Sequence, residues 1–156
     1  MTTVLPPPPI PDRVLCGPFH RPYGAMAADG VKTIETRGRP WHKEPSWLAI
    51  YNCTKIAKLQ NEAARQPGAD RYTGSDETVI GPDAHVIGMV FIQGSRLLQP
   101  EDVPLSFFYE PGRFAWLLTH AIRFVEPIPM QALGIKKGPQ SAVWVPGGPL
   151  SDARKR

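Results

Sequence analysis

At 156 residues the chain is long enough for one domain with a sizeable core, and a second domain is not expected. Its composition, 42% hydrophobic and 21% charged with 19 prolines and 14 glycines, is that of a turn-rich globule and argues against a helical bundle. The net charge of +4 is compatible with an anionic partner but is a weak argument by itself, and the absence of a run of about 18 apolar residues argues against a membrane partner.

Residues 1–12 are predicted to form a proline-rich arm laid over the domain. The proline run at 6–9 favours an extended polyproline conformation and cannot occupy a helix interior. The arm is either a simple leader or a proline-rich ligand for a protein partner. It lacks the charged and apolar regions of a signal peptide, so a cytoplasmic location is expected.

The segments that follow are predicted to be a short strand, a helix and a second strand, at 14–17, 21–30 and 32–37. Pro22 suits the first turn of the helix, and Gly30 suits the position after its last turn. In the second strand Glu35 and Arg37 point to one side and Ile34 to the other, because successive strand side chains alternate between faces.

The middle of the chain is predicted to be a buried strand, an amphipathic helix and a loop, at 47–53, 54–66 and 67–84. The strand is a continuous apolar run bounded by polar segments. Thr54 suits the helix cap, and Ile56, Leu59 and Ala63 follow at helical spacing. The alternating charges of the loop suit a mobile insertion.

Strands are predicted to dominate the rest of the chain, at 85–98, 113–129 and 140–148. Gly88 and Gly94 interrupt the first of them, as glycines do at bends and close backbone approaches, and the second turns a corner near Ala121. A disordered basic tail at 149–156 leaves an expected domain at 13–148. Five or six strands with about two helices predict a mainly β, α+β fold, built as a small closed or nearly closed barrel.

Several segments, taken in order, resemble the ASCH family, whose members share a PUA-like β-barrel fold. These segments read RPYGAMAADGVKTIETR, WLAIYNCTK, VIGMVFI, FAWLLTHAIRFVEPIP and VWV. The most specific part is a Gly-x-Lys-Thr-x-Glu-x-Arg strand motif, matched by Gly30, Lys32, Thr33, Glu35 and Arg37. The family's Pro-aromatic pair and its Trp ahead of a Pro-containing turn are matched by Pro22 with Tyr23 and by Trp116 with Pro127 and Pro129.

The resemblance implies a cleft in which Lys32, Glu35 and Arg37 gather, and it implies a link to RNA binding. Some relatives are similar to nucleases or to amidohydrolases that remove an acyl group from a modified cytidine. Those amidohydrolases combine the lysine with a threonine, whose place Glu35 takes here, and with an acidic residue from another loop. The candidates for that acid are Glu101, Asp102 and Glu110. Fold alone does not choose among these activities.

The three motif side chains suit a nucleotide. An arginine fork matches a phosphate or a base edge, a carboxylate accepts from an exocyclic amine, and a lysine adds a compact charge or a general acid. In the enzyme alternative Lys32 is the acid or base, and Glu35 is the proton acceptor or a metal ligand. The opposing interpretation is a surface ion pair between Glu35 and Arg37, worth at most about 1 kcal/mol, with Lys32 merely solvated.

Cations and rings surround this strand in the sequence, as expected where single-stranded bases stack and phosphates are tracked. Beside the motif residues, the predicted ligand-binding set is Arg21, Tyr23, Arg39, Trp41 and Arg113. Trp41 is the predicted stacking residue, whereas Tyr23 also suits half-buried packing. His20 and His42 both flank the motif and suit an acid or base near neutral pH. Three tryptophans lie in apolar runs and are expected in the core: Trp47, Trp116 and Trp144.

The cysteines and histidines predict no cofactor. Cys16 and Cys53 lack CxxC spacing and are expected to be buried free thiols. No histidine pair has ligand spacing, so no structural metal is predicted, although a weakly held divalent ion would leave no signature. Three hypotheses stay open: a binding module for single-stranded RNA or a modified nucleotide, a hydrolase on the same cleft (a ribonuclease or an N4-acetylcytidine amidohydrolase), and a protein-interaction domain.

Overall fold

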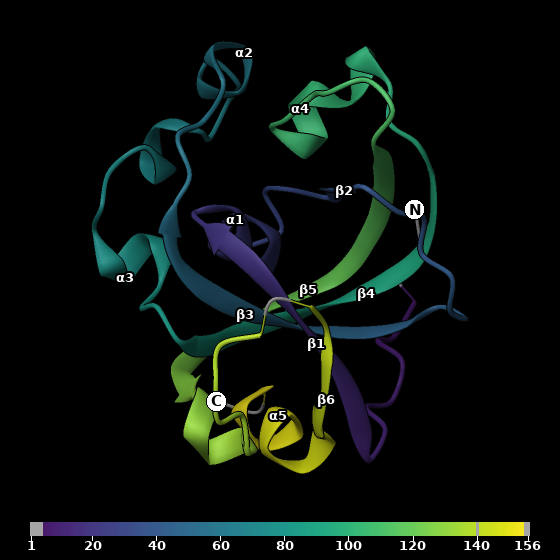
Figure 1. Ribbon diagram of the computed structural model, residues 1–156, viewed down its shortest axis with the longest axis vertical. Helices are drawn as coiled ribbons and strands as arrows, with labels where there is room; N and C mark the ends of the chain where they lie inside the picture. Colours follow the sequence, from purple (N-terminus) through teal and green to yellow (C-terminus); the bar gives the residue numbers. More distant parts are fainter. Residues whose placement is uncertain (1–4, 140, 155–156) are drawn as a thin grey trace.

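The computed structural model describes residues 5–139 and 141–154 as one strongly curved sheet with short helices on both faces (Figure 1). The strands are β1 (Arg13–Arg21), β2 (Ile34–Arg37), β3 (Ser46–Ile56), β4 (His85–Leu97), β5 (Phe114–Pro129) and β6 (Val143–Pro146). The α-helices are α1 (Tyr23–Ala28), α2 (Asn61–Ala64), α3 (Glu77–Ile80), α4 (Val103–Ser106) and α5 (Gly147–Arg154). Three 3-10 turns complete the chain: η1 (Asp70–Tyr72), η2 (Pro100–Asp102) and η3 (Met130–Leu133).

Hydrogen bonding orders the strands β2-β5-β4-β3-β1-β6. β1 and β3 run parallel, and the other neighbouring pairs are antiparallel. β2 and β6 stand at the two ends of this order, so no backbone ladder between described residues closes the sheet. The structure confirms the predicted α+β fold with six strands, in the form of a curved open sheet.

The sheet carries an apolar layer on each face because β3 is apolar on both of its sides. Leu48 and Ile50 belong to a buried cluster that includes the residues of α1. Trp47, Ala49 and Tyr51 alternate with them and belong to a second cluster, which includes residues of η3 and α5. This double burial explains the continuous apolar run and confirms the buried strand predicted at 47–53.

α1 lies close against the hollow face of the sheet, and a glycine makes room for it. Residues 24–28 are all buried. A Cβ atom on Gly88 would lie 2.2 Å from the carbonyl oxygen of Ile122 and 2.8 Å from the Cβ of Ala28. The pairing of β4 with β5 shifts register beside Gly88, and His120 in β5 has a φ of 50°. The glycine interruption and the corner predicted near Ala121 therefore mark the bend of these two strands.

β1 separates from β6 halfway along its length. Its residues 13–16 pair with β6, while its later residues keep only β3 as a strand neighbour within the described chain. β2 lies beside this free edge, because Nη2 of Arg37 donates a 2.7 Å hydrogen bond to the carbonyl oxygen of Pro18. We call this opening between residues 18–21 of β1 and β2 the seam.

Two predictions for the middle of the chain were wrong in part. The helix expected at 54–66 is replaced by a longer β3, whose end pairs with β1, and by the single turn of α2. Of the three apolar positions expected on that helix, Leu59 and Ala63 are buried, whereas Ile56 is 45% exposed. The loop expected at 67–84 contains η1 and α3.

The C-terminal residues also differ from expectation. Residues 147–154 form α5, and Leu150 in it is fully buried, where a disordered tail was expected from 149 onward. Residues 155–156 of that tail and residues 1–4 of the arm lie outside the described residues. The described part of the arm, residues 5–12, contains no helix or strand and contacts the domain where Nε1 of Trp47 donates to the carbonyl oxygen of Pro8 at 3.1 Å.

The three tryptophans expected in the core have different environments. Trp47 is 2% exposed, Trp116 is half-buried, and Trp144 is 50% exposed. The prediction for Trp144 was wrong because β6 buries only one face: Val143 and Val145 pack on the core, and Trp144 alternates with them.

Candidate functional site

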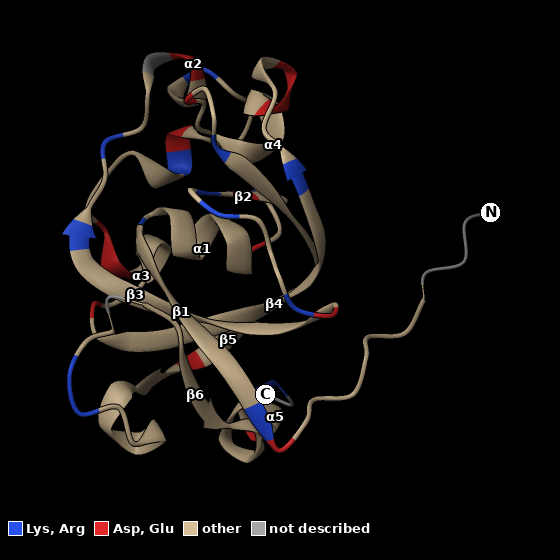
Figure 2. Ribbon diagram, turned by 45° about the vertical axis from the view of Figure 1, so that its right-hand side comes forward, with Lys and Arg blue, Asp and Glu red and all other residues tan. Residues whose placement is uncertain are grey.

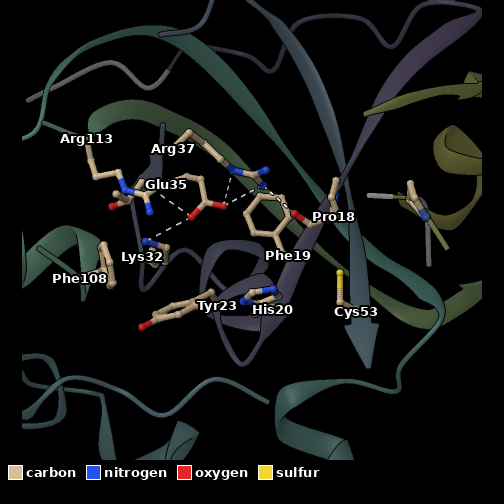
Figure 3. A pocket seen from close by; sticks show the side chains of 12 residues that line it. Pro18, Phe19, His20, Tyr23, Lys32, Glu35, Arg37, Cys53, Phe108 and Arg113 are labelled. Atoms are coloured by element: carbon tan, nitrogen blue, oxygen red, sulfur yellow. Dashed lines mark hydrogen bonds and ion pairs between the residues drawn. The ribbon is translucent and has the colours of Figure 1, made fainter. Parts of the chain in front are cut away.

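A cavity of about 580 Å³ lies at the seam. Its lining comes from β1, α1, β2, β3 and the loops before β2, β5 and β6 (Figure 3). The lining residues are Pro18, Phe19, His20, Tyr23, Lys32, Glu35, Thr36, Arg37, Cys53, Phe108, Arg113 and Pro139.

Lys32 is buried in the wall of this cavity, with 1% of its side chain exposed. Its Nζ donates to the carbonyl oxygens of Ile34, at 2.5 Å, and of Ser106, and lies 3.6 Å from Oε1 of Glu35. Two carbonyl oxygens therefore accept from the ammonium, and the Glu35 carboxylate forms an ion pair with it. Burial lowers the pKa of Lys32 to about 8, although the charge of Glu35 opposes the change. Lys32 thus joins β2 to the end of α4 and fixes one side of Glu35.

Glu35 and Arg37 form the polar floor of the cavity. Glu35 is 9% exposed at its side chain, and its Oε1 accepts a 3.2 Å hydrogen bond from the backbone N–H of Thr36. Its Oε2 accepts from Nε of Arg37 at 3.1 Å and lies 3.0 Å from Nη2. The guanidinium carbon of Arg37 lies 4.9 Å from the ring centre of Phe19 and 5.2 Å from that of Trp116. A quarter of the Arg37 side chain is exposed, so it can meet an anionic ligand while it holds Glu35.

Aromatic rings of Phe19, Tyr23 and Phe108 flank this floor (Figure 3). Phe19 is buried, whereas Tyr23 and Phe108 are half-buried. Burial, with a smaller effect from the charge of Glu35, raises the pKa of Tyr23 to about 12, so its phenol is neutral at physiological pH. Rings around a charged floor suit a flat ligand that carries polar edges.

The structure brings several of the predicted site residues to this cavity. Those that line it are Tyr23, Lys32, Glu35, Arg37 and Arg113. Arg113 reaches the rim from the start of the β5 hairpin, where its Nη2 lies 3.4 Å from Glu110 in an ion pair exposed to solvent. Exposed pairs of this kind are weak, so Arg113 is available to a ligand.

The other predicted ligand-binding residues lie elsewhere. Arg21 is buried and donates to the carbonyl oxygen of Thr54 at 2.6 Å. Trp41 packs edge-on against Trp116, with ring centres 5.0 Å apart, so its ring is engaged within the protein. Arg39 is exposed outside the cavity.

Sequence reasoning missed the contributions of Cys53, Phe108 and Pro139. Cys53 is half-buried and faces the cavity, unlike Cys16, which is fully buried as expected. Burial raises the pKa of the Cys53 thiol more than the charge of Arg37 lowers it, so the thiol stays protonated at neutral pH. No local pattern identifies these residues, because β3 and the later loops reach the site only through long-range pairing.

Three acidic residues, Glu101, Asp102 and Glu110, were candidates for a catalytic acid supplied by another loop, and they have different environments. Asp102 forms a bidentate pair with Arg96, at 2.7 and 2.8 Å. Glu101 lines a separate hollow beside α4, and Glu110 is paired with Arg113 at the rim. Glu35 is the single carboxylate among the described residues that line the main cavity, and no three His, Cys, Asp or Glu side chains within 5–139 and 141–154 are grouped to hold a metal ion.

Comparison with known proteins relates this architecture to solved structures. No family model and no curated protein matches the sequence. The crystal structure of ASCH from Zymomonas mobilis matches with a TM-score of 0.53 at 16% identity, over 89% of this chain and 91% of that chain. A serine-to-alanine mutant of the same protein gives a TM-score of 0.56 at 19% identity, over 86% and 90% of the two chains. A tyrosine-to-phenylalanine mutant gives 0.53 at 16% identity, over 83% and 88%.

The chain has the ASCH-domain fold. At identities of 16–19% the likeness concerns the ASCH fold and carries no residue role by itself. The fold expected from the motif around Lys32 is therefore confirmed. Within the described residues of this ASCH fold, none of the helices has the length and apolar character that a membrane crossing requires.

Proposed function

We propose that the cavity at the seam binds one nucleotide of a single-stranded RNA. The observation that supports this most is the arrangement of a nearly buried carboxylate, two arginines and three rings around one hollow of about 580 Å³. A base is flat and apolar on its faces and polar on its edges, and its phosphate is anionic. Each of these properties has a counterpart in the lining.

Glu35 is the residue that would recognise a base edge. Its carboxylate is held from both sides by Lys32 and Arg37, so it is oriented before a ligand arrives. A carboxylate accepts from an exocyclic amine such as N4 of cytosine. Arg37 and Arg113 would meet the phosphate, because their side chains are 25% and 40% exposed and line the same cavity.

A hydrolase on the same cavity is the second candidate, and the presence of both His20 and Glu35 in the lining favours it. A histidine with a carboxylate is suited to proton transfer near neutral pH. Lys32 contributes to this candidate by orienting Glu35, since its ammonium donates to two carbonyl oxygens and is paired with the Glu35 carboxylate. Cys53 contributes no nucleophile while its thiol is protonated.

The test is a titration of a fluorescently labelled single-stranded oligocytidine and of cytidine monophosphate, followed by anisotropy and calorimetry. Arg37→Ala removes charge-assisted hydrogen bonds, so it is expected to weaken both ligands by roughly 10- to 150-fold. Glu35→Gln is expected to weaken cytidine monophosphate more than uridine monophosphate, titrated in parallel. Equal affinity of wild type and Arg37→Ala, or no binding by wild type, would overturn the proposal.

Arg65→Ala is the matched control for the loss of one positive charge. The Arg65 side chain is 75% exposed, forms a surface ion pair with Glu62 and does not line the cavity. It should leave affinity nearly unchanged. The hydrolase is tested in the same samples by chromatography of labelled RNA and of N4-acetylcytidine, with a new product expected from wild type and none from Glu35→Gln.

A further inference from the structure

Trp144 is an exposed aromatic ring flanked by two cations. Half of this residue is accessible to solvent, although it lies in a strand. The guanidinium carbon of Arg13 lies 5.2 Å from its ring centre, and Nζ of Lys43 lies 5.3 Å from it. Both cations are themselves exposed. An accessible ring with positive charge beside it is the arrangement on which single-stranded bases stack and to which their phosphates are drawn.

Strand register places Trp144 on the same face of the sheet as the cavity. Trp144 pairs directly with Leu15 of β1, and directly paired residues project to one side of a sheet. Leu15 belongs to the same buried cluster as Phe19, which lines the cavity, whereas Val143 and Val145 contact the cluster on the opposite face. From Leu15 to Phe19 the strand advances about 13 Å, so Trp144 lies within reach of nucleotides adjacent to one in the cavity.

The connection between β2 and β3 joins the two places. It begins after Arg37, whose side chain lines the cavity, and it carries Lys43, whose ammonium approaches Trp144. Arg39 and His42 between them are exposed, and Glu44 is the one acidic residue of the connection. Figure 2 shows the basic residues along this connection and at the start of β1.

We propose that Trp144 is a second stacking position for the same RNA strand, with Arg13 and Lys43 binding the adjacent phosphates. The proposal rests on the nucleotide-binding function of the cavity. A base occupies a face of the indole ring when one of the two long cationic side chains swings aside, and that cation then meets the phosphate of the stacked nucleotide. The ligand is accordingly an oligonucleotide that spans both places, and a mononucleotide uses the cavity alone.

The test compares an oligocytidine of about eight nucleotides with cytidine monophosphate, within the site sizes usual for single strands. Trp144→Ala is expected to weaken the oligonucleotide by roughly 5- to 150-fold and to leave the mononucleotide unchanged. Trp144→Phe should restore most of the affinity because it keeps a stacking ring. Lys43→Ala should reduce the slope of log affinity against log salt by about 0.7, the value for one phosphate contact with a single strand.

Val125→Ala is the matched control, since Val125 is an exposed apolar residue on β5, 70% accessible, outside the cavity lining. Wild-type affinity of Trp144→Ala for the oligonucleotide would overturn this inference and leave the cavity function standing. A loss of mononucleotide binding in Trp144→Ala, with circular dichroism unchanged, would overturn it too, because the two positions would then not be separate. If wild type binds neither ligand, both proposals fail.

Discussion

Glu35 and Asp29 are two nearly buried carboxylates that differ in where their partners come from. Their side chains are 9% and 16% exposed. Glu35 forms ion pairs with residues close to it in the sequence, Lys32 three positions before it and Arg37 two positions after it. Asp29 draws on distant segments: it accepts from Tyr72 at 2.6 Å and from Nη1 of Arg123 at 3.1 and 3.2 Å.

The difference separates a site that faces a cavity from a contact that holds the fold together. The partners of Glu35 line a hollow at the seam, whereas neither Asp29 nor its partners line it. Tyr72 is 2% exposed and belongs to the segment 67–84, which was expected to be mobile. Its bond to Asp29 connects that segment to the end of α1, and Arg123 adds β5. The charges of one cluster are therefore suited to a ligand, and those of the other to stability.

The largest effect on stability is expected from Lys32→Met. This variant tests whether Lys32, Glu35 and Arg37, which line the cavity, also stabilise the fold. The carbonyl oxygens of Ile34 and Ser106 lose their donor, and Glu35 loses one of its two cations. The free energy of unfolding should fall by about 3 kcal/mol, measured by denaturant titration. A loss below about 1 kcal/mol would show that the Lys32 ammonium is dispensable for folding. The Glu35 group would then serve the cavity alone, and only the Asp29 group would stabilise the fold.

The contribution of Lys32 to the free energy of unfolding is also expected to depend on pH. The folded-state pKa of Lys32 is about 8, below the ordinary lysine value of about 10.4, because of burial. Between these values the unfolded chain binds more protons, so the unfolding free energy of wild type should rise relative to Lys32→Met by at most about 1.4 kcal/mol per pH unit. This stabilisation linked to Lys32 is fully present above its unfolded-state pKa, and it is lost as pH falls through its folded-state pKa of about 8. Parallel curves for the two proteins from pH 8 to 10 would contradict the assignment.

The smallest effect is expected from Tyr72→Phe in the Asp29 cluster. The variant removes one hydrogen bond and leaves the ring in place, so stability should fall by about 1 kcal/mol. Amide hydrogen exchange should accelerate within 67–84 and stay unchanged in β2. Arg71→Ala serves as the control, since Arg71 is 61% exposed and 3.8 Å from Asp29. Weaker cavity binding in Tyr72→Phe would contradict the separation of the two clusters.

This contrast also explains which features were readable from the sequence. The pairing of Glu35 with Arg37 was predictable because strand alternation puts both on one side, whereas the place of Lys32 beside them was an expectation drawn from the family resemblance, since Lys32 precedes β2. The Asp29 contacts span 43 and 94 positions, and no periodicity records such pairs. Strand number and the α+β class followed from apolar patterning, whereas the helix at 54–66 failed because pairing of Ile56 with Arg21 keeps the chain extended there.

The tryptophans show two outcomes. The stacking role of Trp41 stays a prediction, and its half-buried ring packs edge to face with Trp116. Trp144 was placed in the core because valines flank it. The same alternation that buries Val143 and Val145 turns Trp144 outward, so strand period was the informative pattern and overall apolarity was not.

At the seam, the mouth of the cavity does not depend on backbone pairing between strands. Among the residues that the structure describes, one side-chain hydrogen bond, from Arg37 to the carbonyl oxygen of Pro18, spans the seam, where a closed barrel would have a backbone ladder. If the proposed nucleotide binds, Arg37 can turn its guanidinium toward the phosphate by giving up this one hydrogen bond, and no pairing between strands is broken. The shape of the cavity mouth thus depends on a side-chain hydrogen bond, whereas the stability of the sheet depends on backbone hydrogen bonds. A ligand of a different size could therefore be accommodated at the mouth without a change in strand pairing.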